Sequence, residues 1–551
     1  MAGEPTQGGT WQERPPEIYL EIDAAMQSGE MLVAAALARQ AIAAGHSHHI
    51  LFTLQAHWHE TEGRYMAACV ALERALILQP GDARILTSLS RCRAADGRLA
   101  GALAAADAAI AADPGYAAAH QNRAFALETM GELDAAWAAY SLALELDPAS
   151  IDAAGRLAWL SARRGDRDQA RAHAVRVLDR QPSQPMASAA LIIADLSEKK
   201  FADAEERARA VAANPNAPAQ SRAQATSFAG DAVEGQGRFA EAFALYTEAN
   251  NAMKALYRDR MEGPSAPPLG QAVARRLAQE FAAIPSAAWT EAAPAPPGDA
   301  AGLVFLMGFP RSGTTLLGQI LAAHSRVSLI EERPLLEESV ELFIARQGGL
   351  ARLAGMTELD VAQGRELFWN HVRSHAGDVR GRIVVDQSPL NTLHLPIIAK
   401  LFPEARVVFA VRDPRDTVLG CFRQRFVVNV YLYEFLSLEG SARFYDLTMR
   451  LAEMYREALP LRFLDVRNED VVADFDGRTR ALCDYLGLEW EEGLRNFSRG
   501  ARERRISTPS ALQVARGLNA DGIGRWRSYA KEMEPVLSLL QPWVERFGYQ
   551  P

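Results

Sequence analysis

Along the first half of the chain, apolar residues follow the spacing of amphipathic helices and are interrupted at fixed intervals. Glycines recur every 34 residues and each is followed seventeen residues later by a proline, at Gly63, Gly97, Gly131 and Gly165 and at Pro80, Pro114, Pro148 and Pro182. Small residues keep the same register, at Ala68, Ala102, Ala136 and Ala170. Glycine opens the turn of a helical hairpin, alanine lets its two helices approach closely, and proline ends the second helix. The pattern predicts an α-solenoid of about six repeats over residues 16–258.

Two proline-rich stretches follow the repeats. Pro264 to Pro268 and Ala292 to Pro297 would each interrupt a helix, and the segment between them, Gln271 to Ile284, has helical spacing. We therefore expect a disordered N-terminus over residues 1–15, the solenoid over 16–258, a linker with one connecting helix over 259–300, and a second domain over 301–551.

In the second domain, apolar runs alternate with helical spans, which is typical of a parallel sheet with helices on both faces. The expected strands are Leu303–Met307, Ile383–Val385, Arg406–Val411 and Leu461–Val466. The expected helices are Thr314–Ala323, Thr392–Leu401, Asp416–Arg425, Ala442–Glu457 and Arg478–Leu486. Ligands bind at the carboxyl ends of such strands, and the polar motifs of this half fall there.

The first of these strands runs into a loop and a helix with the spacing Gly308-x-x-x-x-Gly313-Thr314-Thr315. Glycines bring bare N–H groups against an anion, and a helix N-terminus adds free amides and positive charge. The spacing is that of a P-loop, except that Thr314 stands where that motif has lysine. Arg311 supplies a cation from within the loop. The pattern predicts a phosphate-binding loop; the alternative is an ordinary glycine-rich turn.

The loop sequence Pro310-Arg311-Ser312-Gly313-Thr314-Thr315 resembles the 5′-phosphosulfate loop of sulfotransferases that use 3′-phosphoadenosine 5′-phosphosulfate (PAPS). It is most similar to the loop of tyrosylprotein sulfotransferases and of bacterial proteins that join tetratricopeptide repeats to such a domain. The resemblance reaches about Tyr549, and the first half is similar to the repeats of those bacterial proteins. It implies an all-α tetratricopeptide solenoid followed by an α/β three-layer, P-loop-like domain. It also implies that Arg311, Ser312, Gly313, Thr314 and Thr315 bind the 5′ end of PAPS.

An acidic pair, Glu331-Glu332, follows a short apolar run. A carboxylate with a raised pKa can take the proton of an acceptor hydroxyl, but an acidic pair on a loop is also often only solvated. In tyrosylprotein sulfotransferases the catalytic glutamate has the spacing of the second residue of this pair. The resemblance therefore assigns the base to Glu332.

Gln387, in the motif Asp386-Gln387-Ser388-Pro389, departs from the family pattern. The family has a lysine at this place, beside the oxygen that bridges phosphate and sulfate. Gln387 can donate a hydrogen bond there but carries no charge, which leaves Arg311 as the cation. Losing such a contact commonly costs about 2–4 kcal/mol of transition-state stabilisation.

Arg412 follows the third expected strand, in a segment similar to the 3′-phosphate motif of sulfotransferases. There an arginine and a serine eight residues later hold the phosphate. Arg412 matches the arginine, whereas Gly420 takes the place of the serine. From the residues alone, a salt bridge of Arg412 with Asp413 or Asp416 is the alternative.

Near the C-terminus, two segments resemble the closing loop of the family, in which a serine and a basic residue reach the nucleotide phosphates. The resemblance implies that Ser510, Arg516 and Arg525 contact the donor and that Trp526 packs over the site.

The net charge of −9 argues against a dedicated nucleic-acid-binding protein, which usually has a basic excess. The four cysteines form no Cys-x-x-Cys pair, and no stretch reaches the ~18 apolar residues of a membrane helix. We therefore expect no membrane span, no metal and a cytoplasmic protein.

These observations together predict a sulfotransferase that uses PAPS, releases 3′-phosphoadenosine 5′-phosphate (PAP), and acts on a hydroxyl of a peptide, a sugar or a small phenol. Peptide tyrosine is suggested by the resemblance, and the repeats offer a groove for a protein or peptide. Two alternatives stay open: a P-loop kinase, and a repeat scaffold whose second domain has lost catalysis.

Overall fold

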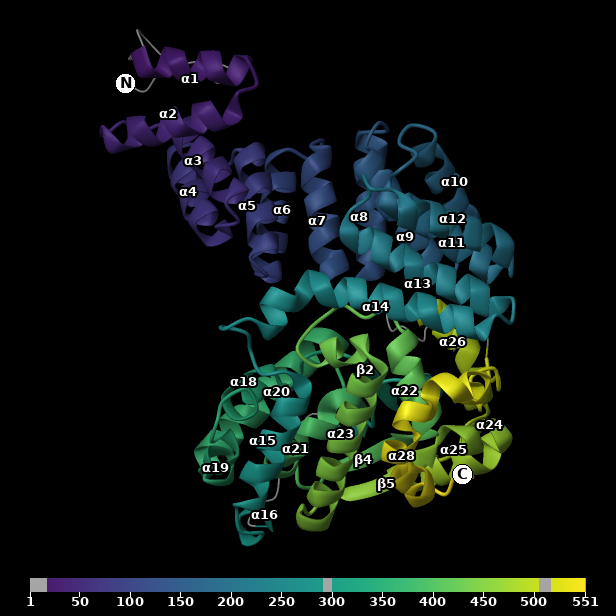
Figure 1. Cartoon of the computed structure of the whole chain (residues 1–551). Coiled ribbons are helices and arrows are strands. Elements are labelled where there is room, and N and C mark those ends of the chain that lie inside the picture. Colours follow the sequence, from purple (N-terminus) through teal and green to yellow (C-terminus); the bar gives the residue numbers. More distant parts are fainter. Residues whose placement is uncertain (1–16, 291–299, 505–516, 551) are drawn as a thin grey trace. The chain divides into compact units, whose positions relative to one another are not determined.

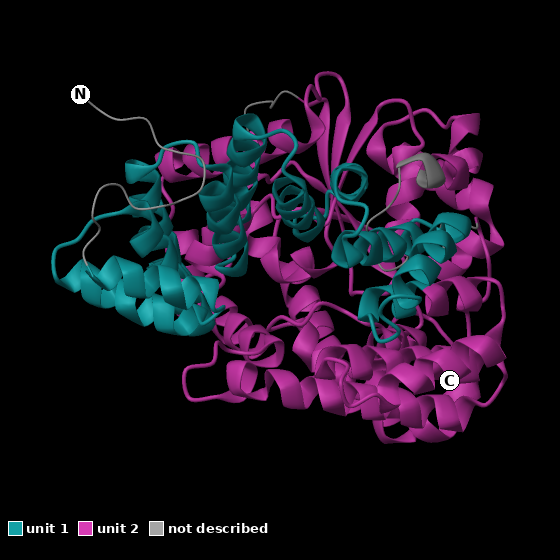
Figure 2. Cartoon of the chain, turned by 90° about the horizontal axis from the view of Figure 1, so that it is seen from above, with its two compact units in different colours: residues 1–190 teal, residues 191–551 magenta. Residues whose placement is uncertain are grey.

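The computed structural model describes residues 17–290, 300–504 and 517–550. The chain divides into two compact units, residues 1–190 and 191–551 (Figure 2). No helix in the described ranges is long and apolar enough to cross a membrane.

Unit 1 is a series of antiparallel helical hairpins (Figure 1). Its helices are α1(Glu17–Gln27), α2(Met31–Ala43), α3(His49–Thr61), α4(Tyr65–Leu78), α5(Ala83–Ala95), α6(Leu99–Ala112), α7(Ala117–Thr129), α8(Leu133–Leu146), α9(Ile151–Arg163) and α10(Arg167–Leu178); α11(Pro185–Ser197) crosses the limit between the units. The periodic glycines at 63, 97, 131 and 165 turn each hairpin with φ of 69–81°. The periodic alanines Ala68, Ala102, Ala136 and Ala170 are fully buried between helices. The predicted solenoid is confirmed.

Unit 2 begins with helices of the same kind, α12(Phe201–Ala213), α13(Ala219–Gly235) and α14(Phe239–Glu262), followed by α15(Gly270–Ala282) and α16(Ala287–Thr290). The hairpin α13–α14 packs on the domain that follows. Asn250 donates a hydrogen bond to the carbonyl oxygen of Phe422 at 2.8 Å. The ring of Phe243 lies 5.0 Å from that of Phe422, centroid to centroid. The last helical hairpin and the sheet domain therefore share one core.

The sheet of unit 2 has five strands, all parallel, in the order β2-β3-β1-β4-β5. They are β1(Gly302–Met307), β2(Val327–Glu331), β3(Ile383–Gln387), β4(Arg406–Val411) and β5(Arg462–Arg467). Since β1 lies between β3 and β4, and β2 lies beside β3, the segments that follow these strands meet at one edge of the sheet.

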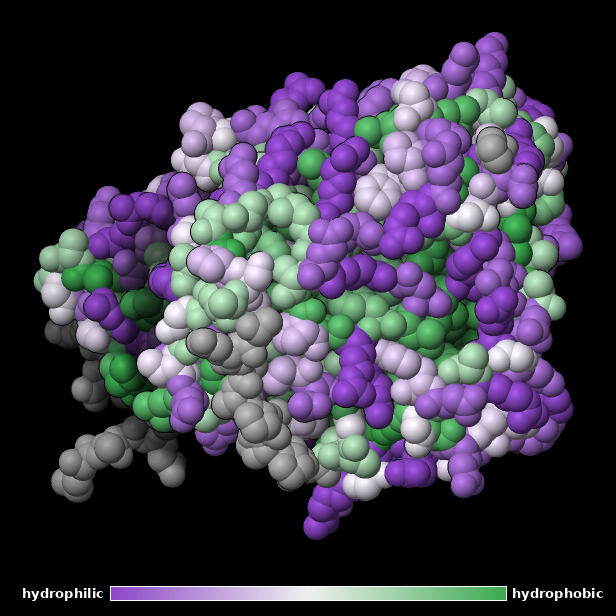
Figure 3. Space-filling view, turned by 90° about the horizontal axis from the view of Figure 1, so that it is seen from below, coloured by the Kyte–Doolittle hydropathy of each residue, from purple (hydrophilic) through white to green (hydrophobic). Residues whose placement is uncertain are grey.

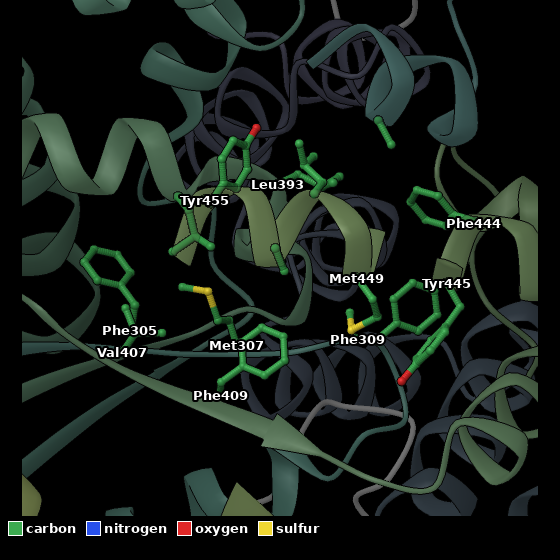
Figure 4. Packing of buried hydrophobic residues seen from close by; sticks show 14 of the residues in the cluster. Phe305, Met307, Phe309, Leu393, Val407, Phe409, Phe444, Tyr445, Met449 and Tyr455 are labelled. Carbon is green, nitrogen blue, oxygen red and sulfur yellow. The ribbon is translucent and has the colours of Figure 1, made fainter. Parts of the chain in front are cut away.

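Helices cover both faces of this sheet, so the domain has three layers. On one face Phe305, Met307, Val407 and Phe409 pack against α20, α21 and α23 (Figure 4). On the other face Val304, Leu306, Val385 and Val408 pack against α17 and α25. The remaining bounds in this domain are α17(Thr314–Ala322), α18(Glu337–Phe343), α19(Gly349–Ala354), α20(Glu358–Ala376), η1(Pro389–His394), α21(Leu395–Leu401), α22(Pro414–Arg423), η2(Leu432–Leu436), α23(Leu438–Ala458), α24(Asn468–Ala473), α25(Phe475–Leu486), η3(Glu492–Asn496), α26(Phe497–Arg504), η4(Arg525–Tyr529) and α28(Ala530–Arg546). The predicted fold class is confirmed.

Hydrophilic residues cover most of the side of the chain seen in Figure 3, and hydrophobic ones gather between them. Such a mixture of hydrophilic and hydrophobic residues is ordinary for a protein surface in water and does not by itself mark a binding site.

Candidate functional site

The loop between β1 and α17 is tightly packed at its two glycines. A Cβ atom on Gly308 would lie 2.5 Å from the carbonyl oxygen of Ala410. Gly313 has φ of 105°, and a Cβ there would lie 2.8 Å from Oδ1 of Asn468. Only glycine fits either position, so the backbone between them stays open to a ligand.

Polar groups fix this loop from outside and leave one hydroxyl unused within it. Thr392 donates from Oγ1 to the carbonyl oxygen of Gly308 at 2.6 Å, and the Cys421 thiol donates to that of Pro310 at 3.2 Å. Ser312 is buried, and its Oγ has no hydrogen-bond partner among the described residues. Because buried hydroxyls are normally paired, the Ser312 Oγ fits a ligand oxygen.

Arg311 has an unusual backbone and a half-buried side chain. Its φ is 71°, in the left-handed region that residues other than glycine rarely adopt. Burial, and then the neighbouring charge of Arg412, lower the pKa of Arg311 to about 10. The guanidinium therefore stays charged at neutral pH. Keeping this charge partly away from water costs free energy, and a bound anion would offset that cost.

Arg412 follows β4 and, among the described residues, donates only to carbonyl oxygens, from Nη1 to Arg311 at 3.3 Å and from Nη2 to Gly522. No carboxylate in the described part of the chain forms an ion pair with it. Asp413 pairs with Arg415 at 2.8 Å, and Asp416 accepts the backbone N–H groups of Gly524 and Trp526. Neither salt bridge considered for Arg412 from the sequence is formed, so its charge is available to a ligand.

Four arginines, Arg311, Arg412, Arg423 and Arg525, line a first cavity of about 310 Å³ beside this loop. Gly313, Thr315, Gly420 and Asn468 are also in its wall. A Cβ atom on Gly420 would lie 3.4 Å from Cβ of Arg311, so a larger residue there would narrow the cavity beside that side chain. Asp416 and Asp521 also line the cavity, so the four arginines still leave an excess of positive charge, which fits a ligand with several negative charges.

Arg525 and Arg423 are both held by Glu234, a residue of α13. Glu234 is buried, with 4% of its side chain exposed, and its Oε1 accepts from Arg525 Nε at 2.9 Å. Arg423 donates to Oε2 of Glu234, and the Tyr529 hydroxyl donates to Oε1 at 2.6 Å. Burial alone would raise the pKa of Glu234, but Arg423 and Arg525 hold it below its ordinary value. The sequence did not point to Glu234, because it lies in the repeat pattern far from every motif.

Glu332 follows β2 and faces a second cavity of about 660 Å³. Its φ is 46°, and its backbone N–H donates to the carbonyl oxygen of Gln387 at 2.8 Å. Glu332 is an exposed residue that opens onto the cavity. Desolvation of its carboxyl by the neighbouring protein, then the charge of Glu331, raise the pKa of Glu332 to about 7, against the opposing effect of Arg311. Glu331 instead accepts from Gln319 Nε2 at 2.6 Å, so the two carboxylates of the pair are separated.

Arg311, Gly313 and Thr315 lie in the walls of both cavities. The two spaces therefore meet at the loop, with four arginines lining one and Glu332 in the wall of the other.

Gln387 differs from its expected place. It is fully buried at the end of β3 and is absent from the described walls of both cavities. Its side chain lies under α17, where a Cβ atom on Gly318 would be 1.8 Å from Oε1 of Gln387. Neither atom of the amide has a hydrogen-bond partner among the described residues. Gln387 instead contributes its backbone carbonyl oxygen to the site, where it accepts the hydrogen bond from the N–H of Glu332.

A chain of side chains that the sequence did not single out borders the second cavity. Asn391 donates from Nδ2 to Asp386 Oδ2 at 3.0 Å, and its Oδ1 lies 3.1 Å from Nδ1 of His394. Since Asn391 Oδ1 can only accept, Nδ1 of His394 carries the proton. Burial lowers the pKa of His394 to about 4 and raises that of Asp386 to about 7. His394, in the wall of this cavity, is therefore neutral.

The other predicted site residues are Thr314, Thr315, Ser510, Arg516 and Trp526. Thr314 lines the second cavity and Thr315 both. Ser510 and Arg516 lie outside the described residues. Trp526 packs against the Arg415 guanidinium, whose Cζ lies 4.1 Å from the centroid of the Trp526 ring.

Residues 304–492 match the model of the sulfotransferase family. The chain is 23% identical over 263 residues to protein-tyrosine sulfotransferase 1 of Danio rerio, covering 45% of this chain and 72% of that one. An uncharacterized protein of Aquifex aeolicus is 23% identical over 245 residues, which is 43% of this chain and only 32% of the relative. The sulfotransferase domain from the Synechococcus PCC 7002 olefin synthase overlaps 47% of this chain and 99% of its own, at 22% identity and a TM-score of 0.35. This chain therefore joins tetratricopeptide repeats to a domain of the sulfotransferase family, as the resemblance of its loop predicted.

Proposed function

We propose that this protein transfers a sulfuryl group from PAPS to an acceptor hydroxyl and releases PAP. The observation that supports this best is the meeting of the two cavities at Arg311, one lined by arginines and the other by Glu332. Sulfuryl transfer needs an anionic donor on one side of the reacting sulfur and a hydroxyl with its base on the other.

The donor is assigned to the first cavity. The loop amides, Ser312, Thr314 and Thr315 would hold its 5′ end, and Arg412 its 3′-phosphate. The loop has no room for a Cβ at Gly308 or Gly313, and Ser312 Oγ is unpaired among the described residues. These are the features of a backbone cradle for an anion.

The acceptor is assigned to the second cavity. Its hydroxyl oxygen would form a bond to sulfur as the bond between sulfur and the bridging oxygen breaks, and PAP would leave with that electron pair. The hydroxyl proton would pass to Glu332, and Arg311 would stabilise charge on the departing group. Little covalent chemistry is asked of the protein, as in phosphoryl transfer.

Calorimetric titration of the whole chain separates this proposal from its two alternatives. PAP should bind without magnesium, and ATP with magnesium should bind much more weakly, because Thr314 replaces the lysine of a P-loop kinase. Tight binding of ATP with magnesium and none of PAP would favour a kinase. Donor binding without transfer of labelled sulfate to any component of a cell lysate would favour a scaffold that has lost catalysis.

We propose in addition that the repeats bind the acceptor, when it is a peptide, or a partner protein. The support is their architecture alone, since stacked helical hairpins form an extended surface that commonly binds peptide segments. A variant that no longer binds PAP should still bind the peptide or the partner protein through its repeats.

A further inference from the structure

The walls of the second cavity are mostly apolar. Apolar side chains make up the larger part of this wall, among them Pro334, Leu335, Leu336, Val340, Leu390 and Phe426. The neutral polar side chains Ser388, Asn391, His394 and Asn429 also line it. A polar acceptor such as a sugar would leave those of its other hydroxyl groups that face the apolar side chains without partners, which costs binding energy.

The same cavity offers little to a strongly acidic acceptor. Besides Arg311 and Glu332, its charged lining residues in the described part of the chain are Arg333, Glu337 and Glu341. These three residues supply one positive and two negative charges. In the described part of the chain Glu341 pairs with Arg346, at 3.9 Å between the charged atoms of two exposed side chains, and such a pair contributes little. The arginines that favour anions line the other cavity, where we place the donor.

Val427 follows the lining residue Phe426 in the chain and is 87% exposed, more than any other large hydrophobic side chain in the described ranges. A single exposed valine is ordinary on a protein surface and carries no weight here. A volume of about 660 Å³ is in the usual range for a pocket that encloses a small molecule.

From these walls, charges and volume we infer that the acceptor is an uncharged, predominantly apolar alcohol or phenol. This inference rests on the proposed function and narrows it, since an acidic tyrosine peptide would meet two carboxylates and one arginine. The acceptor's hydroxyl would lie beside Glu332, with its hydrocarbon part along Leu336, Val340 and Phe426.

The experiment compares 4-alkylphenols of increasing chain length with a tyrosine peptide flanked by glutamates, all with the whole chain. Binding of each to the PAP-saturated protein is measured by calorimetry, and transfer is measured with labelled PAPS. Affinity and kcat/KM should rise by up to about fourfold per added methylene until the cavity is filled. The acidic peptide should be the poorer acceptor by tenfold or more.

A matched pair of variants tests the location. Val340→Lys puts a cation in the cavity wall and should lower kcat/KM for the longest alkylphenol by tenfold or more while improving the acidic peptide. Leu342→Lys puts the same cation on the same helix at a residue that is 43% exposed and absent from the described wall, and should change neither. PAP binding should be the same in both variants, which shows that they are folded.

Two results would overturn the inference. One is a preference of the native protein for the acidic peptide, and the other is an equal response of both lysine variants to alkylphenol. If PAP itself does not bind, the proposed function fails and this inference fails with it. The calorimetric arm therefore distinguishes the two.

Discussion

Glu332 is the residue whose protonation decides whether the proposed reaction can proceed. Its pKa is raised to about 7, and a base must be ionised, so kcat/KM should rise with pH below about 7 and level off above it. Glu332→Gln should abolish this rise and lower turnover by about 10²-fold or more, while the Kd of PAP changes only a few-fold. Profiles of rate against pH check both statements.

Glu331→Gln is the control for that profile. It removes a negative charge that raises the pKa of Glu332, so the midpoint should move to lower pH with turnover retained. If the same rising limb persists in Glu332→Gln, another group is the base.

Arg412 and Arg311 should divide the donor between them. Arg412→Ala should weaken PAPS binding much more than binding of adenosine 5′-phosphosulfate, which lacks the 3′-phosphate. Arg311→Ala should weaken both ligands, because it belongs to the 5′ end. Competition titrations of the two nucleotides measure the split. Equal losses for both ligands in Arg412→Ala would contradict it.

Gln387 is predicted to tolerate a neutral replacement and to resist a charged one. Its amide is fully buried without a described hydrogen-bond partner. Gln387→Lys would bury an ammonium under α17, so the melting temperature should fall by several degrees. Gln387→Met has a similar length and no polar atoms, and should melt at or above the native temperature. A stable, more active lysine variant would show instead that this side chain reaches the donor.

Sequence reasoning placed three candidate residues after strands, where the structure also has them, and could not tell where the side chain of the residue that ends a strand points; the roles of all four stay predictions. Arg311, Glu332 and Arg412 all come after an apolar run, where a parallel sheet exposes its loops. Gln387 still belongs to β3 and shares the side of Val385, because side chains alternate along a strand. A motif match gives the position along the chain but not whether the side chain points into a cavity or under a helix.

At the scale of elements, four strands were predicted within a residue or two, whereas β2 was noted only as a short apolar run. Its neighbours in the sheet are distant in sequence, and nothing in one short run tells that it pairs with β3. The helices α18, α19 and α20, which separate β2 from β3, went unpredicted. α18 and α19 are short, and six or seven residues give too few turns for a helical period to show. α20 has 19 residues and was missed although its length would allow a period to show.

The hairpin α13–α14 should contribute to stability through Glu234. Glu234→Gln leaves Arg423 and Arg525 without their buried carboxylate, so unfolding should become easier by about 3–5 kcal/mol. PAP, if it binds beside these arginines, supplies negative charge and should raise the melting temperature of the variant more than that of the native protein. Thermal melts with and without PAP measure this.

Glu241→Gln is the control for Glu234. Glu241 lies on α14 with 40% of its side chain exposed and pairs with Arg209 and Arg238 in water-exposed ion pairs. Such pairs contribute little, so its melting temperature should stay close to native. An equal fall in both variants would mean that Glu234 has no special part.

For the whole molecule, the repeats, the parallel sheet and their order along the chain were predicted from periodicity. The division between them was expected near residue 300 and stays a prediction, whereas the compact units divide at residue 190. Proline breaks a helix but does not report which core a helix joins. Phe243 and Asn250 read as ordinary repeat residues, and only their contacts with Phe422 show that they belong with the sheet.

The shared carboxylate of Glu234 limits how such chains can be recombined. A sulfotransferase domain transplanted from residue 300 onward would lack Glu234. Arg423, Arg525 and Tyr529 would then lose the carboxylate to which all three donate hydrogen bonds. A piece that keeps this carboxylate therefore has to begin before α13 and to include the hairpin α13–α14. In lineages that keep this arrangement, Glu234 should change together with Arg423 and Arg525, although some 190 to 290 residues separate them in sequence.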